Sequence, residues 1–306
     1  MFRALSPFVV TALFTLNSPA WADTPQKQDD FPASDTFASG WKYDQGIGAR
    51  VNIPEAIRLY KIAADAGNPL AKGRLAIIYD SGTGVAANKV EADRLTKGLY
   101  PEILKAAENS NAIAQSMLGY MYSDGLGVGR DAQEGFKWFL KAADNHLPVA
   151  MLNIAVSYEH GIGVERNITE AVKWYRKAAD LNLPIAQAYL GDMYLNGAGV
   201  PRNEQEAFRL YSLSAAQNCA HGETNLGALY DRGCVVGCNP FEAARLYRLA
   251  ADQNFAVAQF NLAELYKSGS GVPCNLAEAV RLYRLAAAQG YQSAIEALRC
   301  LGYTDY

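Results

Sequence analysis

The sequence has few of the features from which membrane spans, nucleic-acid sites and catalytic centres are built. Its apolar stretch Phe8–Leu16 is far shorter than the roughly 20 residues that a membrane-spanning helix needs, and no run of spanning length follows it. The 28 Lys and Arg residues face 31 Asp and Glu residues, for a net charge of −3. Since nucleic-acid-binding proteins need a basic surface, we expect neither a membrane span nor a nucleic-acid partner.

Histidine is also scarce. The three histidines, His146, His160 and His221, lie in separate segments of the chain. They offer no evident Ser-His-Asp or Cys-His assembly for nucleophilic catalysis. The sequence therefore predicts that the protein is not an enzyme and needs no cofactor or metal.

An export signal opens the chain. Arg3 precedes the apolar stretch, and residues 17–22 (NSPAWA) end on the small residues Ala20 and Ala22. This order predicts a secretory signal peptide over residues 1–22 that is cleaved after Ala22. Residues 23–35 are polar and contain proline, which predicts a flexible N-terminal segment. We expect the mature protein to be periplasmic or secreted.

The strongest pattern is a period of 36 residues. Tyrosines recur at this spacing, and a glycine follows each of them three residues later. The tyrosines are Tyr122, Tyr158, Tyr194, Tyr230 and Tyr266. A fixed period of this length indicates one short unit copied along a line, which offers a long lateral surface rather than a deep catalytic pocket.

Each unit is typical of two short helices joined by a glycine turn. In the copy that begins at Pro148, Ala150, Ile154 and Tyr158 recur at helical spacing. Gly161 and Gly163 then end the first helix and can adopt the positive φ of a tight turn. The second half carries another apolar face, so each unit is predicted to be a helical hairpin.

The start of each second helix carries an Asx residue, a Glu three positions later and an Arg or Lys three positions further on. The Asx residues are Asn52, Asn88, Asp131, Asn167, Asn203, Asn239 and Asn275. This spacing predicts capping boxes and Glu–Arg or Glu–Lys pairs across one turn, worth about 0.2–0.5 kcal/mol each. We interpret the charged stripe as a solvated helix face rather than a ligand site.

The repeats predict one array over residues 36–306. It comprises a degenerate half-repeat from Phe37, six full repeats and a capping helix near Gln292–Leu301. The full repeats begin near Leu70, Ala112, Val149, Ile185, His221 and Val257. The first full repeat is seven residues too long, around Lys97–Lys105, where Gly98 and Pro101 should interrupt its second helix. This insertion is either a tolerated loop or a partner contact.

The block A-x-x-x-L-G/A-x-x-Y-x-x-G-x-G-V, followed by an Asx-capped helix, resembles Sel1-like repeats, which are relatives of tetratricopeptide repeats. The turns that match are Gly125–Val128, Gly161–Val164, Gly197–Val200 and Gly269–Val272, whereas Gly233–Val236 lacks the second glycine. The resemblance implies an all-α fold, a right-handed α-solenoid of antiparallel two-helix Sel1-like repeats (an α/α superhelix). It also implies an adaptor role in multi-protein complexes.

The resemblance places a partner-binding surface on the concave face, among first-helix residues outside the apolar stripe. Related repeats hold an extended peptide backbone with an asparagine at one such position, and an amide suits this task because it both donates and accepts. The predicted partner-binding residues are Asn153, Tyr189, Asp192, Asn225, Asn261 and Glu264. The alternative is that the asparagines bond between repeats or are merely solvated.

The cysteines are confined to the C-terminal third. They are Cys219, Cys234, Cys238, Cys274 and Cys300, and in an exported protein an odd number leaves at least one unpaired. A zinc site from the first three with His221 is rejected, because a helix of roughly 18 Å separates the two groups of ligands. We predict disulfides Cys234–Cys238 and Cys274–Cys300, with Cys219 free.

Three functions remain open. The first is an exported scaffold that binds a partner polypeptide on its concave face. The second is a weak β-lactamase or penicillin-binding enzyme, as described for cysteine-rich Sel1-like proteins, although the regular disulfide of those proteins is missing here and no acyl-transfer set is evident. The third is a secreted host-directed factor, which shares the fold and differs in destination. The sequence leaves the partner's identity and the oligomeric state open.

Overall fold

The computed structural model describes residues 31–46, 50–233 and 235–303, and these residues form 16 α-helices. The first eight are α1 (Ser34–Gln45), α2 (Ile53–Asp65), α3 (Pro69–Ser81), α4 (Lys89–Thr96), α5 (Tyr100–Glu108), α6 (Ala112–Asp124), α7 (Ala132–Asp144) and α8 (Pro148–His160). The others are α9 (Ile168–Asp180), α10 (Pro184–Asn196), α11 (Glu204–Ala216), α12 (Ala220–Arg232), α13 (Pro240–Ala251), α14 (Ala256–Ser268), α15 (Leu276–Ala288) and α16 (Gln292–Cys300). The predicted all-helical fold is confirmed. The predicted signal peptide and residues 23–30 lie outside the described residues, whereas Ser34 and Asp35 belong to α1.

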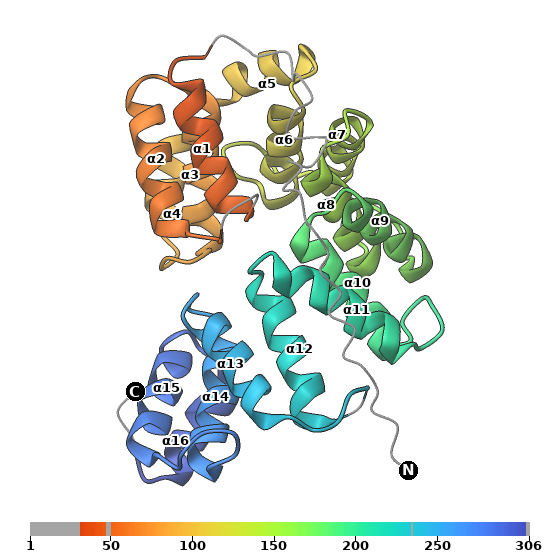
Figure 1. Cartoon of the computed structure of the whole chain (residues 1–306). Coiled ribbons are helices and arrows are strands. Elements are labelled where there is room, and N and C mark those ends of the chain that lie inside the picture. The colour runs from red at the N-terminus through yellow and green to blue at the C-terminus, as the bar shows by residue number, and fades with distance from the viewer. Residues whose placement is uncertain (1–30, 47–49, 234, 304–306) are drawn as a thin grey trace.

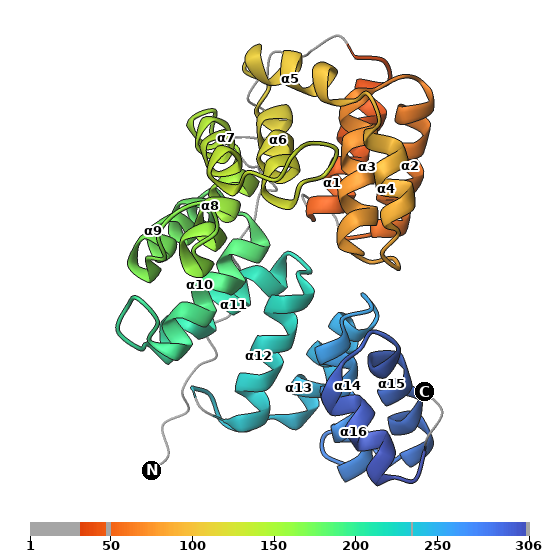
Figure 2. The same cartoon turned by 180° about the vertical axis from the view of Figure 1, so that it is seen from behind.

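The helices pack in pairs along a curved array, so each repeat is a hairpin (Figure 1). The segment that we expected to be a degenerate half-repeat forms two helices, α1 and α2, and is therefore a complete first hairpin. Its apolar face comes from Phe37 and Trp41, which are buried, and Gly40 leaves room for the ring of Tyr60 on α2. Helix α16 packs on α15 and ends the array. Figures 1 and 2 show that the array bends back, so that the first and last hairpins lie on the same side.

The insertion divides the second helix of the second hairpin. Helix α4 ends at Thr96, Gly98 takes a φ of +75°, and the chain restarts as α5 at Tyr100. Pro101 stands in the first turn of α5, where its missing N–H costs no hydrogen bond. The expected interruption is confirmed, and α5 continues into the contact with α6 that one uninterrupted second helix makes elsewhere.

The first half of the predicted capping box is confirmed at every second helix that begins with Asx. Each side chain accepts the backbone N–H of the Glu three residues later, at 3.0–3.1 Å. The reciprocal half is wrong, because each Glu side chain instead pairs with the Arg or Lys of the next turn. The Asx backbone N–H donates to a tyrosine carbonyl of the preceding helix, as Asn167 does to Tyr158 at 2.8 Å. This main-chain bond recurs in each hairpin and fixes the angle between its two helices.

The tyrosines of the 36-residue period also join neighbouring hairpins. Their side chains reach the second helix of the preceding hairpin, through ring contacts or through a hydrogen bond to the hydroxyl. The ring centroids of Tyr122 and Tyr100, Tyr158 and Phe136, and Tyr230 and Phe208 lie 5.4–6.1 Å apart. The hydroxyls of Tyr194 and Tyr266 accept from Arg176 and Arg248 at 2.6 and 2.8 Å. Each of these tyrosines thus accepts a hydrogen bond from the Asx N–H with its carbonyl and contacts the preceding hairpin with its side chain.

Small residues in the first helices admit the aromatic rings of the second helices. A Cβ atom on Gly191 would lie 2.6 Å from the ring of Tyr211, which is fully buried, and Gly119 has the same relation to Phe139. Small residues at these positions therefore let the two helices of a hairpin approach closely. Within the described residues, no helix combines the length and the apolar character needed to cross a bilayer.

Candidate functional site

The concave side of the array holds a pocket of about 610 Å³. First helices form its floor, and turns of the last hairpins form one wall. Its centre is aliphatic and is made by Ile113, Met117, Val149, Leu152 and Ile185. A surface of this kind can receive apolar side chains of a ligand by excluding water from both partners.

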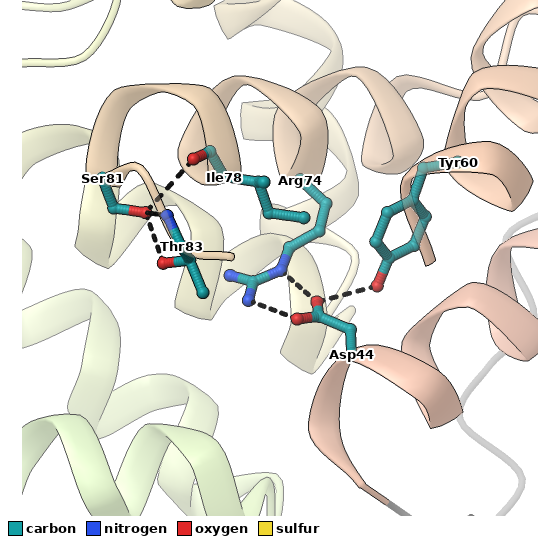
Figure 3. A network of polar contacts seen from close by, with 6 residues as sticks. All are labelled: Asp44, Tyr60, Arg74, Ile78, Ser81 and Thr83. Carbon is teal, nitrogen blue, oxygen red and sulfur yellow. Dashed lines mark hydrogen bonds and ion pairs between the residues drawn. The ribbon is translucent and has the colours of Figure 1, made fainter. Parts of the chain in front are cut away.

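The N-terminal end of the pocket is a paired ionic cluster (Figure 3). Arg74 on α3 makes two hydrogen bonds to the carboxylate of Asp44 on α1, and Tyr60 on α2 donates to the same carboxylate at 2.9 Å. Only 2% of the Asp44 side chain is exposed. Burial raises the pKa of Tyr60 well above its usual value, and the nearby carboxylate adds to this effect. The charges of Arg74 and Asp44 cancel, and their hydrogen bonds join α3 of the second hairpin to α1 of the first.

A second polar cluster lies further along the same face, around Asp192 on α10. Its carboxylate accepts from the hydroxyl of Tyr211 at 2.6 Å and from the amide of Asn225 at 2.8 Å, and it lies 2.8 Å from Nε2 of His221. The ring of His221 contacts the ring of Tyr189, with centroids 5.1 Å apart. Burial raises the pKa of Tyr189, and the Asp192 carboxylate raises it further. Asp192 is therefore a structural acceptor that joins two neighbouring hairpins.

The six predicted partner-binding residues divide into two groups. Asn153 and Tyr189 line the pocket, and both are half-buried. Asp192 and Asn225 bond to each other across a repeat boundary, which is the alternative that the sequence left open for the asparagines. Glu264 accepts from Tyr283 and pairs with Lys267. Asp192, Asn225, Asn261 and Glu264 are not among the residues that line this pocket.

The sequence reasoning missed the contributions of His221 and of α1. In the repeat alignment, His221 occupies the column of Ile113, Val149 and Ile185, all of which line the pocket, so this column carried a usable signal. Trp41 and Asp44 were missed because the first hairpin was read as a degenerate copy. The turn residues on the opposite wall have no local signal, because they reach the pocket only through the curvature of the array.

The structure describes four of the five cysteines, and all four are free thiols: Cys219, Cys238, Cys274 and Cys300. Sγ of Cys238 lies 3.2 Å from the carbonyl oxygen of Asp231, and Sγ of Cys274 lies 3.5 Å from that of Lys267. Cys234 lies outside the described residues. The predicted disulfide Cys274–Cys300 is absent from this structure, in which both thiols are free. The predicted pairing of Cys238 with Cys234 stays a prediction. In the part of the chain that is described, no group of three or more His, Cys, Asp or Glu side chains could hold a metal ion.

Comparison with known sequences identifies the family. The sequence profile of the Sel1 repeat matches residues 37–68, 69–92, 112–147, 148–183, 184–219, 220–255 and 256–291, which is more than half of the chain. The protein belongs to the Sel1 repeat family. The profile includes the first hairpin and stops short of the insertion that divides the second helix of the second one.

Solved structures resemble this chain, among them those of two bacterial proteins. A Sel1 repeat protein from Oxalobacter formigenes is 30% identical, with a TM-score of 0.62, over 74% of this chain and 86% of the other. A protective antigen of uropathogenic Escherichia coli strains is 31% identical, with a TM-score of 0.56, over 88% of this chain and 56% of the other. A curated relative, chitin synthase regulatory factor 3 of Schizosaccharomyces pombe, is 30% identical over 116 residues, which are 37% of this chain and 12% of that protein.

Proposed function

We propose that this protein is an exported scaffold that binds an extended, largely apolar segment of a partner polypeptide in its concave pocket. The observation that carries the proposal is the position of Asn153. Its side chain lines the pocket among the aliphatic residues. Unlike Asn225, it makes no hydrogen bond to another described residue. A free amide in an apolar groove suits a peptide backbone, which presents one donor and one acceptor per residue.

The charges around the pocket support an apolar rather than a charged partner segment. Arg74 is neutralised by Asp44, and Asp192 is occupied by three donors from its own chain. A charged partner side chain would lose its hydration in the pocket without gaining a free counter-ion. Apolar side chains would instead bury surface against Leu152 and its neighbours, at about 25 cal/mol per Å².

We infer that the protein acts by binding rather than by catalysis. Cys219 and His221 both line the pocket, yet among the described residues no hydrogen bond joins the thiol to the imidazole. The imidazole is engaged by Asp192 instead. A base within hydrogen-bond reach is one route to an activated thiol, and the imidazole does not supply it here. The family match supports a repeat scaffold and indicates no catalytic family.

Export is part of the proposal and rests on the signal-peptide pattern of residues 1–22. We propose that the mature chain acts in the periplasm or outside the cell. Fractionation of producing cells, followed by intact-mass measurement, tests this point. A chain that keeps residues 1–22 and stays in the cytoplasm would contradict it, and recovery from the culture medium would favour the host-directed alternative.

A photo-crosslinking experiment tests the binding face. Replacing Leu152 with p-benzoylphenylalanine places the reactive group in the pocket. The same replacement at Leu276, which is 50% exposed and does not line the pocket, is the matched control. We expect a covalent adduct with another polypeptide from Leu152 and not from Leu276. The concave-face proposal is wrong if only Leu276, or neither position, gives an adduct.

Asn153→Ala is expected to weaken partner binding without lowering stability. The variant removes one free amide, and the loss of a backbone hydrogen bond corresponds to about 0.5–1.5 kcal/mol, or a roughly 2- to 12-fold weaker affinity. Asn225→Ala is the contrasting variant, since it leaves Asp192 with one donor fewer and should lower the melting temperature. Titration of the captured partner's peptide, beside thermal melts of both variants, checks this. An unchanged affinity for Asn153→Ala would remove Asn153 from the site.

A further inference from the structure

In three hairpins, a side-chain amide near the start of the first helix bonds to another amide at the end of the second helix. We use the name amide ladder for Gln115, Gln187 and Gln259 together with their partners Asn145, Gln217 and Gln289. The partner donates to the glutamine oxygen at 2.8–2.9 Å in all three hairpins. In the last two, the glutamine Nε2 also donates to the asparagine five residues before it, Asn182 or Asn254, at 3.0 Å. These asparagines stand in left-handed backbone conformation at the repeat boundary.

The glutamine position holds Met151 in the fourth hairpin and a carboxyl group in the sixth. Glu223 occupies the glutamine position, and its Oε2 accepts from Gln253 at 2.7 Å, as the ladder requires. Its Oε1 corresponds to the NH₂ group of Gln115, Gln187 and Gln259, and this buried atom has no hydrogen-bond partner among the described residues. The residue is 1% exposed. An ionised carboxyl cannot donate to Asn218, the boundary asparagine of this hairpin.

Asn218 receives a different donor, from the other end of the chain. Nη2 of Arg50, in the turn between α1 and α2, lies 3.5 Å from Oδ1 of Asn218, although the two residues are 168 positions apart. The charge of Arg50 also acts on Glu223. The array bends back on itself (Figures 1 and 2), so that the first hairpin comes near a later part of the chain. The pocket wall accordingly contains Val51 from the first hairpin and Gln253 from the sixth.

We propose that Arg50, Asn218 and Glu223 form a proton-controlled latch, which holds the first hairpin against the sixth when Glu223 is ionised and releases it when Glu223 is protonated. The ionised carboxylate attracts the guanidinium of Arg50. The protonated carboxyl has an O–H that can donate to Oδ1 of Asn218, as Gln187 donates to Asn182. Protonation therefore removes the charge that attracts Arg50 and leaves the first hairpin held against the sixth only by the 3.5 Å contact between Arg50 and Asn218. The latch closes one side of the concave pocket and therefore controls access to it.

The surroundings of Glu223 raise the pKa of its carboxyl, so that it gains or loses its proton near neutral pH. Burial is the main cause that raises the pKa of its carboxyl to about 7, against the lowering effects of Arg50, the Gln253 hydrogen bond and Arg245 on α13. Asp252, which caps α13, raises it further. Charged groups on the other helices that pack against α12 are paired. On α10, Asp192 pairs with His221 of α12. Arg209 pairs with Glu206 on α11, and Lys267 pairs with Glu264 on α14.

The same shift links proton binding to stability. Because the folded state holds the proton of Glu223 up to about pH 7 and the unfolded chain releases it near its ordinary value of 4.5, the carboxyl lowers stability as the pH rises between these values. Above about pH 7 its contribution is constant. Glu223→Gln should abolish this dependence, because glutamine has no proton to exchange and restores the donor that the other hairpins contain.

Small-angle X-ray scattering between pH 5.5 and pH 8.5 on the purified protein tests the latch. We expect a larger radius of gyration at low pH, with a midpoint near pH 7. Glu223→Gln and Arg50→Gln should each keep the larger value throughout. Gln259→Glu is the matched control, since it puts a carboxyl at the same ladder position in a hairpin that Arg50 does not reach; it should retain the wild-type transition.

A radius of gyration that stays constant in the wild type, or that changes equally in Glu223→Gln, would overturn the latch. Circular dichroism melts of each variant separate opening from unfolding, because the open array keeps its helices. The measurement needs no partner molecule, so its outcome is independent of the proposed binding function. A closed array that does not capture a partner would contradict the proposed function and leave the latch intact.

Discussion

Gly163→Ala is expected to lower the free energy of unfolding by about 2–5 kcal/mol, because two costs combine at this residue. Gly163 has a φ of +70°, in the left-handed region that residues with a Cβ atom avoid. A Cβ atom here would also lie 1.9 Å from the carbonyl oxygen of Ala132, at the first residue of α7. Backbone atoms cannot turn aside as a flexible side chain can, so the turn must move away from the preceding hairpin.

Gly290→Ala separates the two costs. Gly290 has a similar φ of +79°, but nothing lies within 4 Å of the position of its Cβ atom. We therefore expect this control to show the backbone cost alone, about 1–2 kcal/mol. Urea unfolding monitored by circular dichroism measures both variants. Equal losses would mean that the contact between Gly163 and Ala132 contributes nothing to the junction of the hairpins.

The second large effect is expected from Arg74→Met, which should cost about 3–5 kcal/mol. The substitution leaves Asp44 buried with only the hydroxyl of Tyr60 to compensate its charge. It also removes a guanidinium that lies 5.7 Å from the ring of Trp41. Thermal or urea unfolding should therefore show early loss of the first two hairpins, which this cluster joins.

Arg281→Met is the matched control for this prediction. It removes one partner of the Glu278 pair, in which the arginine side chain is 58% exposed, and such solvated pairs contribute little. The double variant Asp44→Asn with Arg74→Met should recover part of the lost stability, because no uncompensated charge remains buried. If Arg281→Met and Arg74→Met shift the melting temperature equally, the burial of Asp44 is not the cause.

The sequence predicted the hairpins well because each of them is specified by nearby residues. The Asx caps, the glycine turns and the apolar stripes all act within one 36-residue unit, and the structure has the helices where these patterns place them. The first hairpin was underestimated because Asp35 and Ser39 stand where the repeat block has its Ala and Leu, although Phe37, Trp41 and Tyr60 still fill its core.

The site was harder to predict, since it depends on contacts between repeats. Asn153 and Asn225 occupy the same repeat column, yet only Asn225 has an aspartate opposite it on the preceding hairpin. The identity of that neighbour, and not the asparagine itself, decides which amide is free. The contact between Arg50 and Asn218 is still harder to predict from the sequence. It depends on the curvature of the array, which results from small rotations between successive repeats.

The hydrogen bond from each Asx N–H to a tyrosine carbonyl has a consequence for how such arrays diversify. Because main-chain atoms such as those of Asn167 and Tyr158 set the hairpin angle, side chains on the inner wall can change without altering the pitch of the spiral. Modules could then be duplicated or exchanged as intact units. A chain lengthened by one module between Arg50 and Asn218 would keep its pitch but move these two residues apart, and the contact between them would be lost.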